Sequence, residues 1–315
     1  MNHSDRFHGV LLLDKPFGIS SHDAILDVRR MTKQRSIGHC GTLDPLATGL
    51  LVLCLGRATK VSRFLTDRDK TYEAEIHLGL TSTTYDSEGV DPDATPHEIP
   101  SLSQVDVHSL LSEFQGTFLQ KVPAYSSVHV NGTRLYKLAR RGEVVETPER
   151  EVTISHIELL RYEEPFLRIR VECGKGTYIR TLAHVIGERI GCGGYLSGLK
   201  RLTTGNLCVD DALSLQQVAE HIDQGDFEDY LLPIGDVLDY AAITVTEEFS
   251  RIVVNGPPLQ RRDIVSLTGE FSAGDDILLR NKTGAVLAIG TAGTHSDEFA
   301  CEDKNHLFRY VRVLN

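Results

Sequence analysis

The stretch "GHCGTLDPLATGLL", from Gly38 to Leu51, carries a single carboxylate, Asp44, between Leu43 and Pro45. Acids in loops usually have polar neighbours, whereas this one is framed by apolar residues in a segment with three glycines. One interpretation is a turn aspartate, because Asp-Pro often begins a turn through local hydrogen bonds. The other is a nucleophile or base held rigidly at a cleft. The tripeptide alone leaves both open, so the rest of the chain has to separate them.

Length and composition place this sequence among ordinary globular proteins. Its 315 residues are enough for about two domains, with 41% hydrophobic and 24% charged residues. The longest apolar run, Leu50 to Leu55, is too short to span a bilayer. The first residues, "MNHSDRFHGV", lack the basic and apolar regions of a secretory signal. We therefore expect a cytoplasmic protein with no membrane partner.

The six cysteines argue against a structural metal. They stand at positions 40, 54, 173, 192, 208 and 301, without a CxxC pair. No histidine lies at zinc-ligand spacing from a cysteine pair. Scattered reduced thiols, packed as small apolar residues, are the better account, and we expect no metal site.

The charge is unevenly distributed. The net charge is −11, yet residues 206–250 contain eleven acids and no Lys or Arg. Residues 1–70 hold eleven Lys and Arg against seven acids, and residues 174–205 hold five against one. Such segregation allows a basic face on an acidic protein, which would suit a nucleic acid. Clustered but merely solvated surface charge is the alternative, and charge alone does not decide between them.

Hydrophobic patterning predicts an α+β fold. Short buried strands are expected in "HGVLLLDKPFG", ending at Pro16 and Gly18, and in "LLVLCLG", from Leu50 to Gly56. Between them, apolar residues recur at helical spacing after Ser20 or Ser21, and another helix is expected from Ala58 to Lys70. The segment from Lys70 to Leu80 alternates like a half-buried strand. Strands, hairpins and helices follow one another without the βαβ alternation of a doubly wound sheet.

The organisation changes near residue 240. Before it, the segment at about 120–150 combines Arg134, Lys137, Arg140 and Arg141 with two tyrosines, a mixture that suits looped RNA, although a plain amphipathic surface helix is the alternative. After it, short apolar stretches alternate with Gly, Asn and Pro turns. This pattern predicts a small β-barrel of about 70 residues. We expect two domains, 1–240 with the 120–150 insertion, and 241–315.

Asp44 has candidate partners in regular elements. Tyr72 lies early in the predicted strand, and Arg180 lies in "KGTYIRT". A nucleophilic carboxylate has to stay ionised inside a cleft, where burial raises its pKa, while an arginine within about 4–6 Å lowers it. A fixed arginine is thus the natural companion of such an acid, and bidentate geometry would also aim it.

Four motifs occur in an order that resembles a known family. "KPFGISS", "GHCGTLDPLATGLLVLCLGRATK", "KTYEAEIHLG" and "GKGTYIRTLAHVIGERIG" resemble those of TruB-type tRNA pseudouridine synthases, which isomerise uridine 55 in the T-loop of tRNA. The resemblance runs from about Val10 to Gly205 and weakly to the C-terminus. It implies a pseudouridine synthase catalytic fold with a mixed, largely antiparallel sheet, and a C-terminal PUA-like RNA-binding barrel.

The resemblance also assigns roles to residues. It makes Asp44 the nucleophile, Tyr72 the residue that stacks on the uracil and removes the C5 proton, and Arg180 the partner of the carboxylate. The substrate-binding residues that it implies are His39, which fills the space left by the extruded base, Tyr178 of the GTYIR motif, Leu199, which walls the uracil pocket, and Lys15, which supports the site.

The implied partner is tRNA, bound through its T-loop and T-stem by a monomer that needs no metal, nucleotide or redox cofactor. Two departures stand out: Cys40 occupies a position where threonine is common, and His129 one where lysine is typical. Two rival functions remain. One is a tRNA-binding chaperone that needs no chemistry, and the other is a glycoside hydrolase, which would require a second carboxylate about 5–10 Å from the first.

Overall fold

The computed structural model describes residues 6–130, 132–143, 146–300 and 307–314. Residues 131, 144 and 145 of the predicted 120–150 insertion lie outside the described residues. So do residues 301–306, which include Cys301, and residue 315 of the predicted 241–315 domain. Across these four ranges, no helix is long and apolar enough to cross a membrane.

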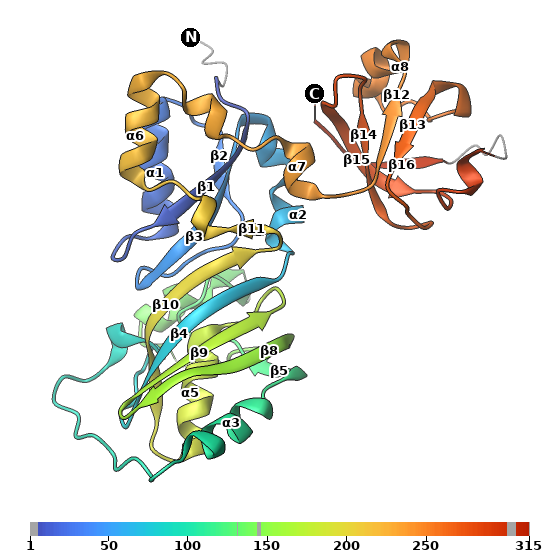
Figure 1. Cartoon of the computed structure of the whole chain (residues 1–315). Helices are drawn as coiled ribbons and strands as arrows, with labels where there is room; N and C mark the ends of the chain where they lie inside the picture. Colours follow the sequence, from blue (N-terminus) through green and yellow to red (C-terminus); the bar gives the residue numbers. More distant parts are fainter. Residues whose placement is uncertain (1–5, 131, 144–145, 301–306, 315) are drawn as a thin grey trace.

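A nine-stranded mixed sheet forms the larger part of the molecule (Figure 1). Its main order is β1-β3-β10-β4-β9-β8-β5, with β2 paired to β3 and β11 paired to β10. The β3–β10 pair is parallel and the other recorded pairs are antiparallel. The strands of this sheet are β1 (Gly9–Lys15), β2 (Ile37–His39), β3 (Ala47–Leu55), β4 (Lys70–Leu78), β5 (Gly116–Lys121), β8 (Glu149–Glu163), β9 (Phe166–Cys173), β10 (Gly194–Thr204) and β11 (Leu207–Cys208).

Helices cover the two ends of this sheet. Helix α1 packs against α6 beside β1, while α3 lies on β8 and α5 on β10 (Figure 1). The α-helices of the described chain are α1 (Ser21–Thr32), α2 (Ser62–Thr66), α3 (Gln104–Ser112), α4 (Leu135–Arg140), α5 (Ile179–Ile190), α6 (Leu215–Gln224), α7 (Ile234–Leu238) and α8 (Glu247–Ile252). A two-stranded hairpin, β6 (His129–Val130) and β7 (Thr133–Arg134), leads directly into α4.

A second sheet of five strands follows α7 and lies to one side of the first (Figure 1). Its order is β13-β12-β14-β15-β16, and its strands are β12 (Ala242–Val245), β13 (Ile264–Thr268), β14 (Asp276–Arg280), β15 (Val286–Ala292) and β16 (Phe308–Val313). Among the described residues β13 and β16 end this path without pairing to each other, so the strand pairing does not close the barrel that the sequence predicted.

The two sheets share part of a core. Leu278 and Ile289 of the second sheet belong to the same buried apolar cluster as Val10 and Val52 of the first. The Arg280 guanidinium also donates to the Gly235 carbonyl at 2.9 Å. The C-terminal sheet keeps a separate cluster of its own around Phe249 and other buried residues. The predicted change of organisation near residue 240 therefore coincides with the start of a second sheet that packs against the first.

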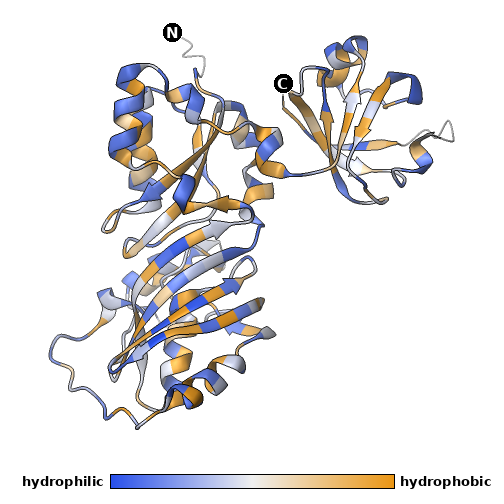
Figure 2. Ribbon diagram, viewed as in Figure 1, coloured by the Kyte–Doolittle hydropathy of each residue, from blue (hydrophilic) through white to orange (hydrophobic). Residues whose placement is uncertain are grey.

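Local sequence explains the elements that frame the cleft. In β4 buried and partly exposed residues alternate along the whole strand, as the period-2 pattern predicts. Figure 2 shows hydrophilic and apolar residues interleaved along β4, β9 and β10 of the larger sheet. The α+β prediction is confirmed. The predicted helix from Ala58 to Lys70 is shorter: a 3₁₀ turn, Gly56–Val61, precedes α2, and β4 begins at Lys70.

Candidate active site

Asp44 lies in the loop between β2 and β3, close to the ends of two other segments. Its carbonyl accepts a hydrogen bond from Ala47 N at 3.0 Å, and the Pro45 carbonyl accepts one from Gly18 N at 2.9 Å. The loop therefore turns directly into β3 and is attached to the turn that follows β1. The sequence placed Asp44 in a glycine-punctuated loop, and this is where it is found.

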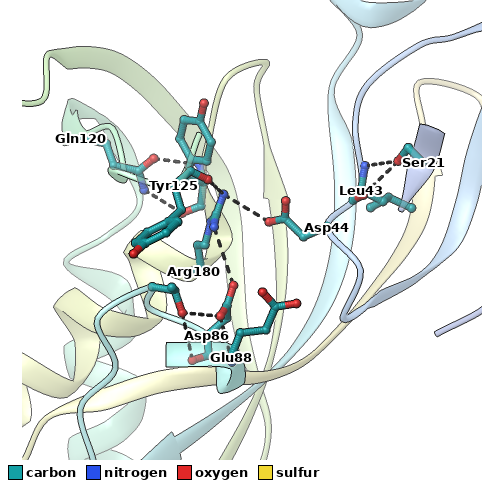
Figure 3. A network of polar contacts seen from close by, with 10 residues as sticks. Ser21, Leu43, Asp44, Asp86, Glu88, Gln120, Tyr125 and Arg180 are labelled. Atoms are coloured by element: carbon teal, nitrogen blue, oxygen red, sulfur yellow. Dashed lines mark hydrogen bonds and ion pairs between the residues drawn. The ribbon is translucent and has the colours of Figure 1, made fainter. Parts of the chain in front are cut away.

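Arg180 faces Asp44 from the first turn of α5. Its Nη2 lies 3.3 Å from Asp44 Oδ2 and donates to the Tyr125 carbonyl at 2.9 Å. Its Nη1 lies 3.6 Å from Asp86 Oδ2 (Figure 3). The Arg180 side chain is 7% exposed, so its charge is removed from water and is balanced by two carboxylates. The predicted pairing of residues 44 and 180 is present, although it is shared with a third residue.

The third residue, Asp86, was missed by the sequence analysis. It lies in the segment "TTYDSEG", where its carboxylate accepts hydrogen bonds from the Thr84 hydroxyl and from Glu88 N. An isolated bridge to Leu196 and burial to 4% exposure fix this acid beside the cleft. The sequence offered no signal for it, because an acid among Ser and Thr residues is the usual composition of an exposed loop.

Burial and the neighbouring charges act in opposite directions on the ionisation of Asp44. Burial raises the pKa of Asp44 above its ordinary value, and the Arg180 guanidinium opposes this effect. The Asp86 carboxylate raises the pKa of Asp44 further, and Lys15 lowers it. The side chain is still 36% exposed to the cleft. Ionisation of Asp44 thus depends on its two basic neighbours, Arg180 and Lys15.

Tyr72 is buried at the inner side of the cleft, and its cross-strand neighbour is Arg201 of β10. Burial raises the pKa of Tyr72, while Arg201 lowers it through its charge and a hydrogen bond. Arg201 is 1% exposed and donates to the carbonyls of Leu50, at 2.7 Å, and Gly41, at 3.1 Å. This arginine was also missed, since a cation in "LKRLTTG" resembles a surface residue of a strand.

Two buried lysines, Lys15 and Lys70, lie close enough to Arg201 for their charges to interact with it. Burial lowers the pKa of Lys15 to about 8 and that of Lys70 to about 8. Lys15 Nζ donates to the carbonyls of Pro16, at 2.9 Å, and Ile19, at 2.7 Å, so it braces the turn after β1. Its charge also acts on Asp44. Lys15 therefore lies beside the site and contacts its scaffold.

The remaining predicted residues are divided between the cleft and its surroundings. Leu199 lies in β10 opposite Ala47 and Ala74. Tyr178 precedes α5, where its backbone N–H and carbonyl bond to the Gln120 side chain at 2.8 and 3.0 Å. His39 ends β2, and burial lowers its pKa.

These side chains surround a cavity of about 960 Å³, large enough for a nucleotide. The structure brings five of the seven predicted residues to its wall and adds the two that were missed; the wall includes Asp44, Tyr72, Asp86, Tyr178, Arg180, Leu199 and Arg201. Lys15 and His39 lie outside this wall. The same cavity is bordered by Arg140, Arg150 and Lys175, whose positive charges would suit a polyanion.

Residues 29–179 match the family model for the TruB family pseudouridylate synthase N-terminal domain. A tRNA pseudouridine synthase B from Bacillus cereus is 40% identical over 288 residues, which cover 89% of this chain and 91% of that protein. The chain belongs to the TruB family of pseudouridylate synthases. It is accordingly an enzyme of the isomerase class, and the resemblance seen in the four motifs is confirmed.

Other comparisons agree with this membership. A tRNA pseudouridine synthase B from Pseudomonas fluorescens is 41% identical, covering 81% of this chain and 84% of that protein. The solved structure of an H/ACA ribonucleoprotein bound to a substrate RNA containing 2′-deoxyuridine contains a chain of the same fold, with a TM-score of 0.76 and 22% identity over 100% of this chain and 91% of that chain. At this identity the structural match shows only that the two chains share a fold.

Proposed function

We propose that this protein isomerises uridine 55 in the T-loop of tRNA to pseudouridine, with Asp44 as the nucleophile. The observation that carries the proposal is the Asp44–Arg180 pair at 3.3 Å, which faces a cavity of about 960 Å³ together with Tyr72. The names of the curated relatives, tRNA pseudouridine synthase B, support tRNA as the substrate.

The reaction can be assigned to these side chains step by step. The target uridine first leaves the folded RNA, and the loss of its stacking and pairing costs roughly a few kcal/mol. Asp44 attacks the extruded nucleoside, the C1′–N1 bond breaks, and the uracil turns while it is held in the cavity. C5 then bonds to C1′, the bond between Asp44 and the nucleoside breaks so that the carboxylate leaves with its electron pair, the C5 proton passes to a base, and N1 gains a proton. The atoms of the nucleoside and of the enzyme are thus conserved. Arg180 holds Asp44 in its ionised form and in position.

Tyr72 acts as the stacking partner and as the base for the C5 proton in this proposal. Its unperturbed pKa near about 10 is too high for a base at neutral pH, and burial raises it further. Arg201 is the neighbour whose charge and hydrogen bond oppose that rise. In the same scheme Leu199 and Tyr178 wall the uracil pocket, and His39 fills the space that the base leaves in the T-loop.

The rest of the chain would hold the tRNA. We assign residues 1–240 to catalysis, with the 120–150 insertion gripping the RNA, and residues 241–315 to a PUA-like RNA-binding domain. The basic side chains on β7 and α4 support the first assignment, and the separate core of the second sheet supports the domain boundary. The protein would act as a monomer without a cofactor.

Mapping of modified tRNA tests this function. Purified protein is incubated with a tRNA transcript carrying uridine 55 and with a matched transcript carrying cytidine 55. Pseudouridine is located by carbodiimide mapping, and free uracil is measured by mass spectrometry. We expect pseudouridine at position 55 of the first transcript and none in the second. Binding of tRNA without any pseudouridine would favour the chaperone, and release of uracil would favour the hydrolase.

A further inference from the structure

The turn after β1 and the start of α1 hold the Asp44 loop at both sides of the aspartate. On one side, Gly18 N donates to the Pro45 carbonyl at 2.9 Å. On the other side, the Ser21 hydroxyl contacts both polar backbone atoms of Leu43: Leu43 N donates to Ser21 Oγ at 2.8 Å, and Ser21 Oγ donates to Leu43 O at 2.9 Å (Figure 3). A single side chain thus fixes both backbone polar groups of the residue before Asp44.

Helix α1 does not need this hydroxyl for its own start. Ser20 is the N-cap: its side chain accepts from Asp23 N at 3.1 Å, and the Asp23 carboxylate accepts from Ser20 N at 3.1 Å. This capping box satisfies the first turn of the helix. Ser21, the first helical residue, is therefore free to direct its hydroxyl to the loop, and it is 1% exposed there.

The position of the Asp44 carboxylate depends on its backbone. Within the described residues, the polar contact of this carboxylate is with Arg180, at 3.3 Å, and its own loop donates no hydrogen bond to it. Arg180 is held independently by Tyr125 O and Asp86. The distance between carboxylate and guanidinium is consequently set by where residues 43–45 are held, and Ser21 provides two of the bonds that hold them.

We propose that Ser21 is a positioning residue for Asp44, acting through the backbone of Leu43. The inference rests on the proposed function, and it concerns how that site is aligned. Ser21 does not touch the substrate in this account. Removal of its hydroxyl leaves the cleft and its charges in place but lets the Asp44 carboxylate move relative to Arg180.

The test compares two variants that each remove one buried hydroxyl from α1. Ser21→Ala removes the loop contact, whereas Thr32→Val removes a hydroxyl that donates to Val28 O at 2.7 Å within the helix itself. For each variant we would measure the dissociation constant for tRNA, the single-turnover rate at saturating tRNA, the dependence of that rate on pH, and the melting temperature, with rates taken well below melting.

We expect Ser21→Ala to lower the single-turnover rate about ten- to hundredfold, because a displacement of a catalytic group by about 1 Å can cost that much. The dissociation constant for tRNA should stay near that of wild type. The acidic limb of the pH–rate profile should move to higher pH, because a more distant Arg180 lowers the pKa of Asp44 less. Thr32→Val should lower the melting temperature and keep the wild-type rate and profile.

A rate and profile for Ser21→Ala that match Thr32→Val would overturn the proposal, since the hydroxyl would then matter for stability alone. Ser21→Thr, which keeps the hydroxyl, should restore most of the rate, and a Thr variant that folds but stays as slow as Ala would also overturn it. If the wild type forms no pseudouridine, the proposed function fails. If the wild type forms it and Ser21→Ala does so equally well, the present inference alone fails.

Discussion

Strand β4 separates two sets of ion pairs that lie in opposite surroundings. On its outer face Glu73 pairs with Arg170 at 2.8 Å and Glu75 pairs with Arg168 at 2.7 Å. All of these side chains are between 26% and 58% exposed. On the cleft side Arg180 meets two acids at longer distances, 3.3 and 3.6 Å, yet it is only 7% exposed.

The shorter pairs are therefore expected to contribute less to the stability of the protein. Exposed pairs are screened by water and contribute about 0–1 kcal/mol to stability. Breaking a buried pair leaves an unbalanced charge and typically costs about 3–5 kcal/mol. The comparison teaches that burial of the cation, more than distance, separates the Arg180 pairs from the surface pairs of β4.

Replacement of the proposed nucleophile should produce the largest effect. In Asp44→Asn the side chain keeps its size but loses the negative oxygen that attacks the nucleoside in the proposed mechanism. We expect the single-turnover rate of pseudouridine formation to fall about 10⁴-fold or more, with tRNA binding retained. Nucleoside mass spectrometry and filter binding on the same samples check both parts. A variant that modifies tRNA at a rate close to wild type would remove Asp44 from the mechanism.

A smaller loss is expected when the buried cation changes shape and keeps its charge. Arg180→Lys cannot reach Asp44, Asp86 and Tyr125 O together, because an ammonium lacks the planar fork of a guanidinium. We expect the single-turnover rate to fall about 10²-fold. The fold of the variant is checked by its circular dichroism spectrum and melting temperature. Full activity in the lysine variant would mean that charge alone suffices at this position.

The smallest effect should come from the outer face. Glu73→Gln removes one exposed pair, and Arg170 keeps Glu158 at 3.0 Å. Stability should change by about 1 kcal/mol or less, and added salt should reduce that difference. The rate should equal that of wild type. Denaturant unfolding at low and high salt tests the first statement. A large loss of activity would show that the two faces of β4 are coupled.

Sequence reasoning was strongest where chemistry and local pattern coincide. Asp44, Tyr72 and Arg180 lie in motifs with regular neighbours, and they do line one cavity. The period-2 alternation of β4 and the capping residues of α1 also followed from local rules. The strand alternation and the helix cap depend on residues close to one another in the chain, so the sequence carries that information directly. The three site residues are far apart in the chain, and the order of the family motifs linked them.

Sequence reasoning was weakest where packing between distant segments decides whether a residue is buried. Asp86 resembles a surface acid until the loop around it bridges to Leu196, and Arg201 resembles a surface cation until β10 lies between β3 and β4. The direction of the Asp44 pKa shows the same limit: the sequence anticipated the effect of Arg180, but burial by distant segments outweighs it. Barrel closure likewise depends on strand pairing that short apolar stretches do not specify.

The central claim is that an ionised Asp44, whose pKa is lowered by Arg180 and raised by Asp86, performs the chemistry. The pH dependence of single-turnover pseudouridine formation tests this claim most directly. The rate should fall as the pH drops through the pKa of Asp44, which burial places above the ordinary value of 3.8. In Asp86→Asn the acidic limb should move to lower pH, because Asp86 raises the pKa of Asp44. A limb that stays in place in this variant, or moves to higher pH, would contradict the account.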